Sequence, residues 1–179
     1  MTTYDNRSRV PIAVPTDPEI RALSAALEAQ RRHVLAILDG LDEPALRRPV
    51  LPSGWSCLGV VRHLALDVER FWFGAVVTGD AGVIAGLAEI DDAWQVDPDR
   101  SAAEVLDRYR TEVALANTVI TGTAADVPLA WWPHDLFGEP HLHSLREVVL
   151  HVITETACHA GHLDAARELI DGRQWLVLG

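Results

Sequence analysis

The chain has 179 residues, enough for one domain with a sizeable apolar core, and 49% of them are hydrophobic. Its basic residues number 15, all of them arginines, against 26 acidic ones, and the formal net charge of −11 argues against nucleic acids or anionic membranes as partners. The absence of lysine excludes a Schiff-base mechanism. No apolar run approaches the roughly 18 residues that a membrane span needs. The first residues, Met1 to Arg7, lack an apolar signal core, so we expect a cytoplasmic protein.

The N-terminal part of the chain predicts an extended arm over residues 1–15, followed by a single domain over 16–179. Pro11 and Pro15 favour the extended arm. The segment Thr16-Asp-Pro-Glu19 has the pattern of a capping box, which predicts the start of the first helix. An apolar stripe continues this helix at Leu23, Leu27, Val34, Leu38 and Leu41, whereas we expect Arg31, Arg32 and His33 to form a surface run.

A second helix is predicted to begin near Ser56, a good N-cap, and to run to about Thr78. It carries His63, and Asp67 follows one turn later. A lone helical histidine is more often structural than a ligand, but bundle metal sites gather ligands from facing helices. His63 is therefore a candidate ligand, and Asp67 a candidate to orient its imidazole.

Two further helices follow, each opened by a capping-box pattern. The third begins at Ser101-Ala-Ala-Glu104 and the fourth at Ser144-Leu-Arg-Glu147, with Gly172 as the expected C-cap of the fourth. Four helical segments without competing alternating strands predict an all-α fold, a four-helix bundle. The connections between helices 2 and 3 and between helices 3 and 4 are long, which is typical of functional loops. From the second of these we expect Trp131, Trp132 or His134 to cover the mouth of a site.

The fourth helix carries the most informative pattern of the chain. Glu155, His159 and His162 stand at i, i+4 and i+7, so they share one face. We expect this face to point inward, because Val148, Val149, Val152, Ala166 and Leu169 extend it in both directions. A carboxylate and imidazoles in a core are costly unless they are paired or bound to a cation. Two nitrogens and an oxygen suit zinc or a neighbouring transition metal, and a buried polar network without metal is the equal alternative.

Other histidines and the cysteines are weaker candidates. His141 and His143 are predicted to lie in a solvated loop, and His151 to pack above the site. Cys57 and Cys158 are expected to be free thiols rather than a disulfide, and Cys158 to be buried. The chain lacks H-E-x-x-H, G-x-S-x-G, P-loop and dinucleotide-binding glycine patterns.

Two blocks of the sequence, Ser53 to Trp72 and Ser144 to Gly172, carry a family resemblance. The chain resembles the DinB-like superfamily of four-helix metalloproteins, especially its actinobacterial branch near mycothiol-dependent maleylpyruvate isomerase and the mycothiol S-transferases. The blocks cover the predicted second and fourth helices. The resemblance is specific for the fold and implies a DinB-like four-helix bundle.

The resemblance also implies a ligand set. In this family one metal ligand is a histidine of the second helix, which His63 matches. Two more lie four residues apart on the last long helix, where the isomerase-like members have the Glu-x3-His pattern that Glu155 and His159 match. His162 stands where common members have Gln or a similar residue, which implies a fourth ligand or a catalytic acid–base group. Zinc is the expected metal, with nickel, iron and manganese as alternatives.

The chemistry that the resemblance implies is thiol activation. A divalent metal would stabilise the thiolate of a low-molecular-weight thiol such as mycothiol, which attacks a small electrophilic substrate to give an S-conjugate or an isomerised product. One alternative is a metal-dependent hydrolase that uses a metal-bound water. Another is a non-catalytic metal-binding bundle that serves as a stress or accessory protein. The oligomeric state is left open, with a homodimer as one option.

Overall fold

A computed structural model describes residues 17–90 and 92–175, and its regular elements are all helices. The predicted all-α class is therefore confirmed for these residues, whereas the predicted arm over 1–15 lies outside them. The elements in chain order are α1 (Pro18–Leu38), α2 (Glu43–Arg47), α3 (Cys57–His63), η1 (Leu64–Val77), α4 (Ala81–Gly86), η2 (Leu87–Glu89), α5 (Ala102–Gly122), α6 (His134–Phe137) and α7 (Leu145–Asp171).

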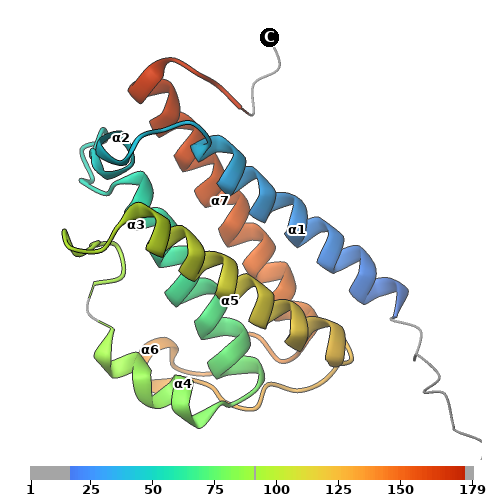
Figure 1. Cartoon of the computed structure of the whole chain (residues 1–179). Helices are drawn as coiled ribbons and strands as arrows, with labels where there is room; N and C mark the ends of the chain where they lie inside the picture. The colour runs from blue at the N-terminus through green and yellow to red at the C-terminus, as the bar shows by residue number, and fades with distance from the viewer. Residues whose placement is uncertain (1–16, 91, 176–179) are drawn as a thin grey trace, which may run out of the picture.

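Four long helical segments make up the body of the described chain: α1, the continuous α3–η1 segment, α5 and α7. Figure 1 shows α1 beside α7, and η1 contacts both α5 and α7. The short elements α4, η2 and α6 lie in the two connections predicted to be long, and α2 lies in the first connection. None of the helices in the described ranges combines the length and apolarity needed to cross a membrane.

Local capping signals fix most helix ends. Ser56 accepts a hydrogen bond from Gly59 N, Ser101 forms the complete capping box with Glu104, and Gly172 ends α7 in the left-handed conformation with φ of 79°. Two details differ from the predictions. Asp17, rather than Thr16, caps α1, and Thr16 lies outside the described residues.

The second difference lies at the start of α7. The Glu147 carboxylate accepts from the backbone N–H of His143 and not from that of Ser144, although the Ser144 hydroxyl does accept from Glu147 N. The capping box of this helix is therefore half formed. The helix nevertheless begins one residue after Ser144, as predicted.

The sequence predicts one α-helix from about Ser56 to Thr78, but the long segment that carries His63 is α-helical only in its first part. From Leu64 to Val77 it is a π-helix, in which each backbone N–H bonds the carbonyl five residues earlier. π-Helical turns are rare and occur frequently at functional sites. Here the change of helix type begins directly after His63.

Burial corrects two predictions. Leu169 is 57% exposed, because the inward face of α7 ends before it with Leu163 and Ala166. Arg31 is 2% exposed and does not belong to a surface run, although Arg32 beside it is exposed. His33 is half-buried. The apolar core includes Leu27, Val34, Leu58, Val61, Leu64, Phe73, Ile120, Val148, Val152 and Leu163.

Arg31 is buried because it is paired. Its Nε donates to Glu69 at 2.7 Å and its Nη2 donates to the other oxygen of the same carboxylate at 2.5 Å. Its Nη1 donates to Glu28 and to Asn117, so that α1, η1 and α5 are joined by one network. Burial lowers the pKa of Arg31, but the carboxylates of Glu69 and Glu28 more than offset this effect and raise it. The guanidinium therefore stays charged inside the fold.

Candidate metal centre

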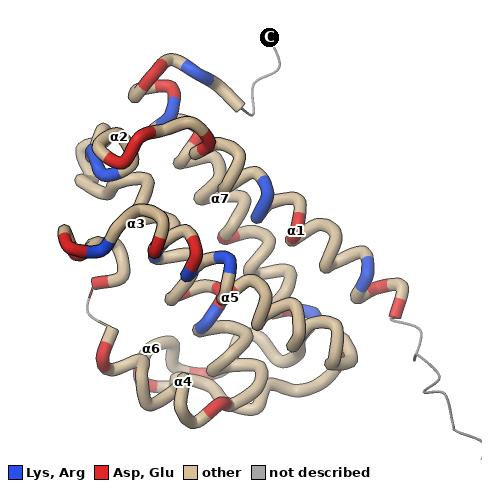
Figure 2. The backbone as a smooth tube through the Cα atoms, in the orientation of Figure 1, with Lys and Arg blue, Asp and Glu red and all other residues tan. Residues whose placement is uncertain are grey.

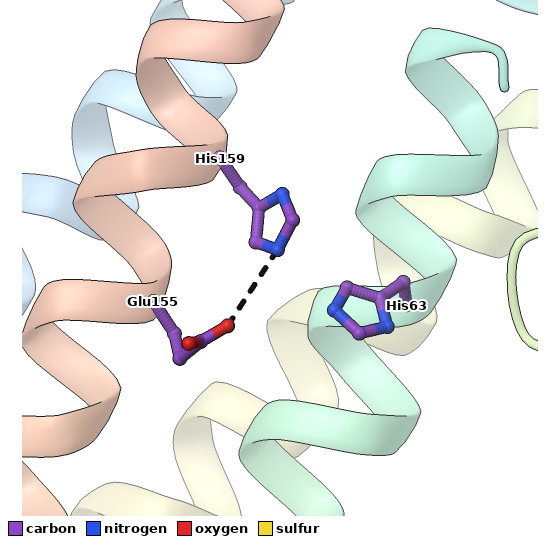
Figure 3. A group of neighbouring side chains, drawn as sticks. All are labelled: His63, Glu155 and His159. Atoms are coloured by element: carbon purple, nitrogen blue, oxygen red, sulfur yellow. Dashed lines mark ion pairs between the residues drawn. The ribbon is translucent and has the colours of Figure 1, made fainter. Parts of the chain in front are cut away.

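Three side chains converge between the continuous α3–η1 segment and α7. Candidate ligand atoms of His63, Glu155 and His159 all lie within 4.8 Å of one another. The two imidazole rings have centroids 4.9 Å apart and meet edge to face. His63 is the last residue of α3, and the other two residues lie on α7, so the second and last long helices face each other across this group (Figure 3).

The geometry on α7 follows from helix periodicity. Glu155 and His159 are one turn apart, and Nε2 of the histidine lies 3.7 Å from Oε2 of the carboxylate. This distance is too long for a hydrogen bond but suits two ligands that share a cation. His159 is buried, whereas the Glu155 side chain is 39% exposed. The group therefore lies at the edge of the core with one side accessible.

Each imidazole is held at its Nδ1 atom. Nδ1 of His63 is 2.9 Å from Oδ2 of Asp67, one turn further along the helix. The Asp67 carboxylate thus occupies the position that the sequence suggested for it. A histidine that donates Nδ1–H to a carboxylate has Nε2 available as a ligand, and such pairs commonly support metal-bound histidines. Figure 3 shows that the Nε2 atoms of His63 and His159 point toward the Glu155 carboxylate.

His162 reaches the group from a different side. Its Nδ1 lies 3.4 Å from Nδ1 of His159, whereas Nε2 of His159 faces Glu155. Its ring lies 6.0 Å from that of Trp55, and the residue is exposed. His162 is thus close to the three converging residues but does not share their cluster of ligand atoms.

The environment favours the neutral form of His159. Burial lowers the pKa of this imidazole from 6.5 to about 4, and the neighbouring His63 and His162 add to the effect. A histidine must be neutral to bind a metal ion, and His159 meets this condition at neutral pH. The donor set of two imidazoles and a carboxylate is that of a His2Glu catalytic zinc site.

Sequence reasoning missed Trp94, which stacks on His63. The ring centroids are 4.2 Å apart with an angle of 17° between the planes, and Trp94 also meets His159 edge to face at 5.4 Å. Two hydrogen bonds hold its loop: Trp94 N donates to the Asp92 side chain, and Arg62 donates to the Asp92 carbonyl at 2.8 Å. The loop also lies against Gly59, the one signal that could have indicated a close backbone approach.

The sequence predicts that Trp131, Trp132 or His134 covers the mouth of the site, but the ring contacts of the two tryptophans lie elsewhere. Trp132 packs against Trp72, Phe137 and His141, and Trp131 against Phe71, so the pair belongs to an aromatic cluster around α6. Neither indole has a ring contact with His63 or His159 among the described residues. His134 begins α6 and is exposed.

The remaining histidines lie outside the group formed by His63, Glu155 and His159, which we call the converging group. His151 packs against Trp72 with ring centroids 4.6 Å apart. Burial lowers its pKa, the neighbouring Glu155 opposes this, and His141 adds to it. His141 and His143 are exposed, as predicted for loop residues.

Both cysteines are free, as expected, but they differ in environment. Cys57 is buried, and burial raises the pKa of its thiol to about 11. Cys158 is exposed, which corrects the prediction that it is buried. It precedes the buried His159 by one residue, and one residue turns the side chain by roughly 100° around a helix.

Comparison with known proteins connects this arrangement to one family. A family model described as mycothiol-S-transferase matches residues 22–172, which include α1 from its second turn and the whole of α7 with its C-cap Gly172. A search among curated proteins returned no match. The matched range contains all three residues of the converging group.

Proposed function

We propose that this chain, which belongs to the mycothiol S-transferase family, is a metal-dependent enzyme that transfers a low-molecular-weight thiol to a small electrophile. In this proposal His63, Glu155 and His159 bind one divalent metal, with zinc as the expected ion and nickel, iron or manganese as alternatives. The observation that carries it is the convergence of these three side chains from two helices. Mycothiol is the proposed thiol, on the strength of the family.

Neighbouring side chains orient the two imidazoles. Asp67 holds Nδ1 of His63, and His162 lies against Nδ1 of His159, so each ring offers Nε2 to the shared space. Glu155 adds a negative charge, which makes the site a weaker Lewis acid than three imidazoles would. A metal ion bound there would supply positive charge that stabilises a thiolate at neutral pH.

In the transfer itself, the thiolate sulfur attacks the electrophilic carbon of the substrate. A carbon–sulfur bond forms, and the leaving group departs with its electron pair, or the added electron pair is protonated where the substrate has no leaving group. We propose that His162, exposed beside His159, accepts or returns the thiol proton. The sequence left open that His162 is a fourth ligand, and its approach from the Nδ1 side of His159 favours the acid–base role.

Around this site we propose a DinB-like four-helix bundle, formed as a single domain over residues 16–179. The four long segments α1, α3–η1, α5 and α7 support the bundle.

The direct experiment combines metal analysis with a thiol-conjugation screen. The purified full-length chain is stripped with a chelator, reloaded with zinc, and assayed with mycothiol and a panel of small electrophiles. We expect product formation that requires both the metal and the thiol. Product formation with metal but without thiol would support the hydrolase alternative. Tight stoichiometric metal without turnover would support the accessory-protein alternative.

Replacement of His162 tests its role. His162→Gln with retained metal and lost turnover would support acid–base catalysis, whereas lost metal would indicate ligation. His143→Gln is the matched control, because this histidine is exposed and lies outside the converging group. It should leave both metal content and turnover unchanged.

A further inference from the structure

A cavity of about 600 Å³ lies on another side of the helical segment that carries His63. It is bounded by α3–η1, by α5 and by the α4–η2 segment, and neither His63 nor the two ligand candidates on α7 line it. Its volume is in the range of small-molecule sites. The cavity is therefore a separate feature from the candidate metal centre.

The walls of this cavity combine an apolar floor with an arginine rim. Leu66 and Val105 are buried beneath it. Its arginines are Arg62, Arg70, Arg100 and Arg108, and its acidic residues are Glu89, Glu104 and Asp107.

Two of these charged residues are paired with partners outside the cavity lining: Asp107 with Arg110, and Arg108 with Glu112. Arg62, Arg70 and Arg100 then stand against Glu89 and Glu104. Figure 2 shows that the first half of α5 carries both acidic and basic positions. The lining thus keeps an excess of positive charge in a chain whose net charge is −11.

Arg70 is the arginine that η1 contributes to the cavity. It is half-buried, and within the described part of the chain its guanidinium has no ion pair or hydrogen bond. Gly86 makes room for it, because a Cβ at that position would lie 3.0 Å from Nη2 of Arg70. Arg62, two turns earlier, uses Nη1 for the Asp92 carbonyl and keeps its other N–H groups available. Two guanidinium groups are therefore presented above an apolar floor.

We infer that this cavity binds an organic anion, a small molecule with an apolar body and a carboxylate or phosphate group. The apolar body would cover Leu66 and Val105, and the oxyanion would accept hydrogen bonds from Arg62 and Arg70. Guanidinium groups match the planar, two-oxygen geometry of these anions. This second site is independent of the metal and of the proposed S-transfer.

The test uses anilinonaphthalene sulfonate, a fluorescent probe with an apolar body and an anionic group, and the full-length chain. We expect saturable binding at one site, weakened about tenfold by Arg70→Gln and by Arg62→Gln, since a charge-assisted hydrogen bond is worth about one factor of ten. Arg21→Gln on α1 is the control, because Arg21 is exposed and lies outside the cavity lining, and it should change the affinity less than about twofold. Displacement by benzoate or by phenyl phosphate tells which anionic group the site prefers.

Circular dichroism of each variant establishes that it is folded, and if one of the two cavity variants is not, the other decides. Binding that is not saturable, or that is weakened equally by Arg21→Gln and by the cavity variants, would overturn the inference. The outcome does not depend on metal or turnover, so it is separable from the test of the proposed function.

Discussion

Two polar groups lie between the long helices of this protein, and they differ in how their charges are met. Around Arg31 and Glu69, both at most 2% exposed, each guanidinium nitrogen has a partner within hydrogen-bond distance. In the converging group, Glu155 and His159 approach only to 3.7 Å, although both imidazoles are held in place at Nδ1.

The difference indicates different roles for similar residue types. A buried pair that satisfies itself fixes how helices pack, and it needs nothing from outside. A group of ligand atoms that lie close together without bonding to one another leaves room for a cation between them, as the proposed function requires. The internal contacts of a polar group, more than its composition, therefore separate a structural network from a binding site.

The largest effect is expected from removing a ligand of the converging group. His63→Ala and His159→Ala should each abolish stoichiometric metal binding, with at least roughly a 100-fold loss of affinity, because three protein ligands leave no spare. Activity should be lost with the metal. Titration of the chelator-treated protein, with His143→Ala as control, measures this. If both variants still bind one equivalent at wild-type affinity, the proposed site is wrong and the loop with His141 and His143 becomes the next candidate.

The next largest effect is expected from removing the charge of Glu69 in the Arg31 network. Glu69→Gln leaves the Arg31 guanidinium buried without its main countercharge and should lower the free energy of unfolding by about 3 to 5 kcal/mol. The exposed pair of Arg47 and Glu43 provides the control, since Glu43→Gln should cost less than about 1 kcal/mol. Denaturant unfolding compares the two variants. Equal losses would show that the buried pair is no more important than a surface pair.

A third prediction concerns acid. Because the pKa of His159 is about 4 in the folded chain and 6.5 without burial, the unfolded chain binds this proton first as the pH falls. The stability that the neutral imidazole contributes is complete above pH 6.5 and is lost as the pH falls toward 4. The full loss is about 3 kcal/mol, from 1.36 kcal/mol per pKa unit.

The measurement is denaturant unfolding of the metal-free protein at several pH values, and the difference between wild type and His159→Gln isolates this residue. The two proteins should diverge in the pH dependence of their stability within that window. Parallel pH profiles would contradict the assigned environment of His159.

The smallest effect is expected from changing Asp67, which contacts His63 but is not itself a proposed metal ligand. Asp67→Asn should weaken metal binding about tenfold, because the amide holds Nδ1 of His63 less strongly than the carboxylate does. The exposed Asp67 contributes little to packing, so the unfolding free energy of the metal-free protein should stay nearly constant. A loss of stability without a loss of metal affinity would make Asp67 a structural residue only.

Much of the fold could be predicted from sequence because its signals are local. Ser56, Ser101 and Gly172 end their helices through contacts within a few residues. The spacing of Glu155 and His159 likewise depends only on the period of a helix. The family resemblance then supplied the partner, His63, from another helix.

The features that escaped prediction depend on contacts between distant segments. Arg31 is 38 positions from Glu69, and nothing near Arg31 in the sequence indicates that it is buried. Trp94 stacks on His63 only because its loop folds back over α3, whereas the ring contacts of Trp131 and Trp132 lie in the aromatic cluster around α6. The π-helical hydrogen bonding after His63 has no signal in the sequence that we could identify.

The close approach of a loop to Gly59 limits which amino acids position 59 can tolerate. A methyl group on Gly59 would lie 2.2 Å from the carbonyl oxygen of Trp94, and because that atom belongs to the backbone, the whole loop would have to move. Even alanine would therefore shift the indole away from His63. In a saturation mutagenesis screen, Gly59 should tolerate substitution as poorly as a ligand does, although it carries no side chain and touches no metal.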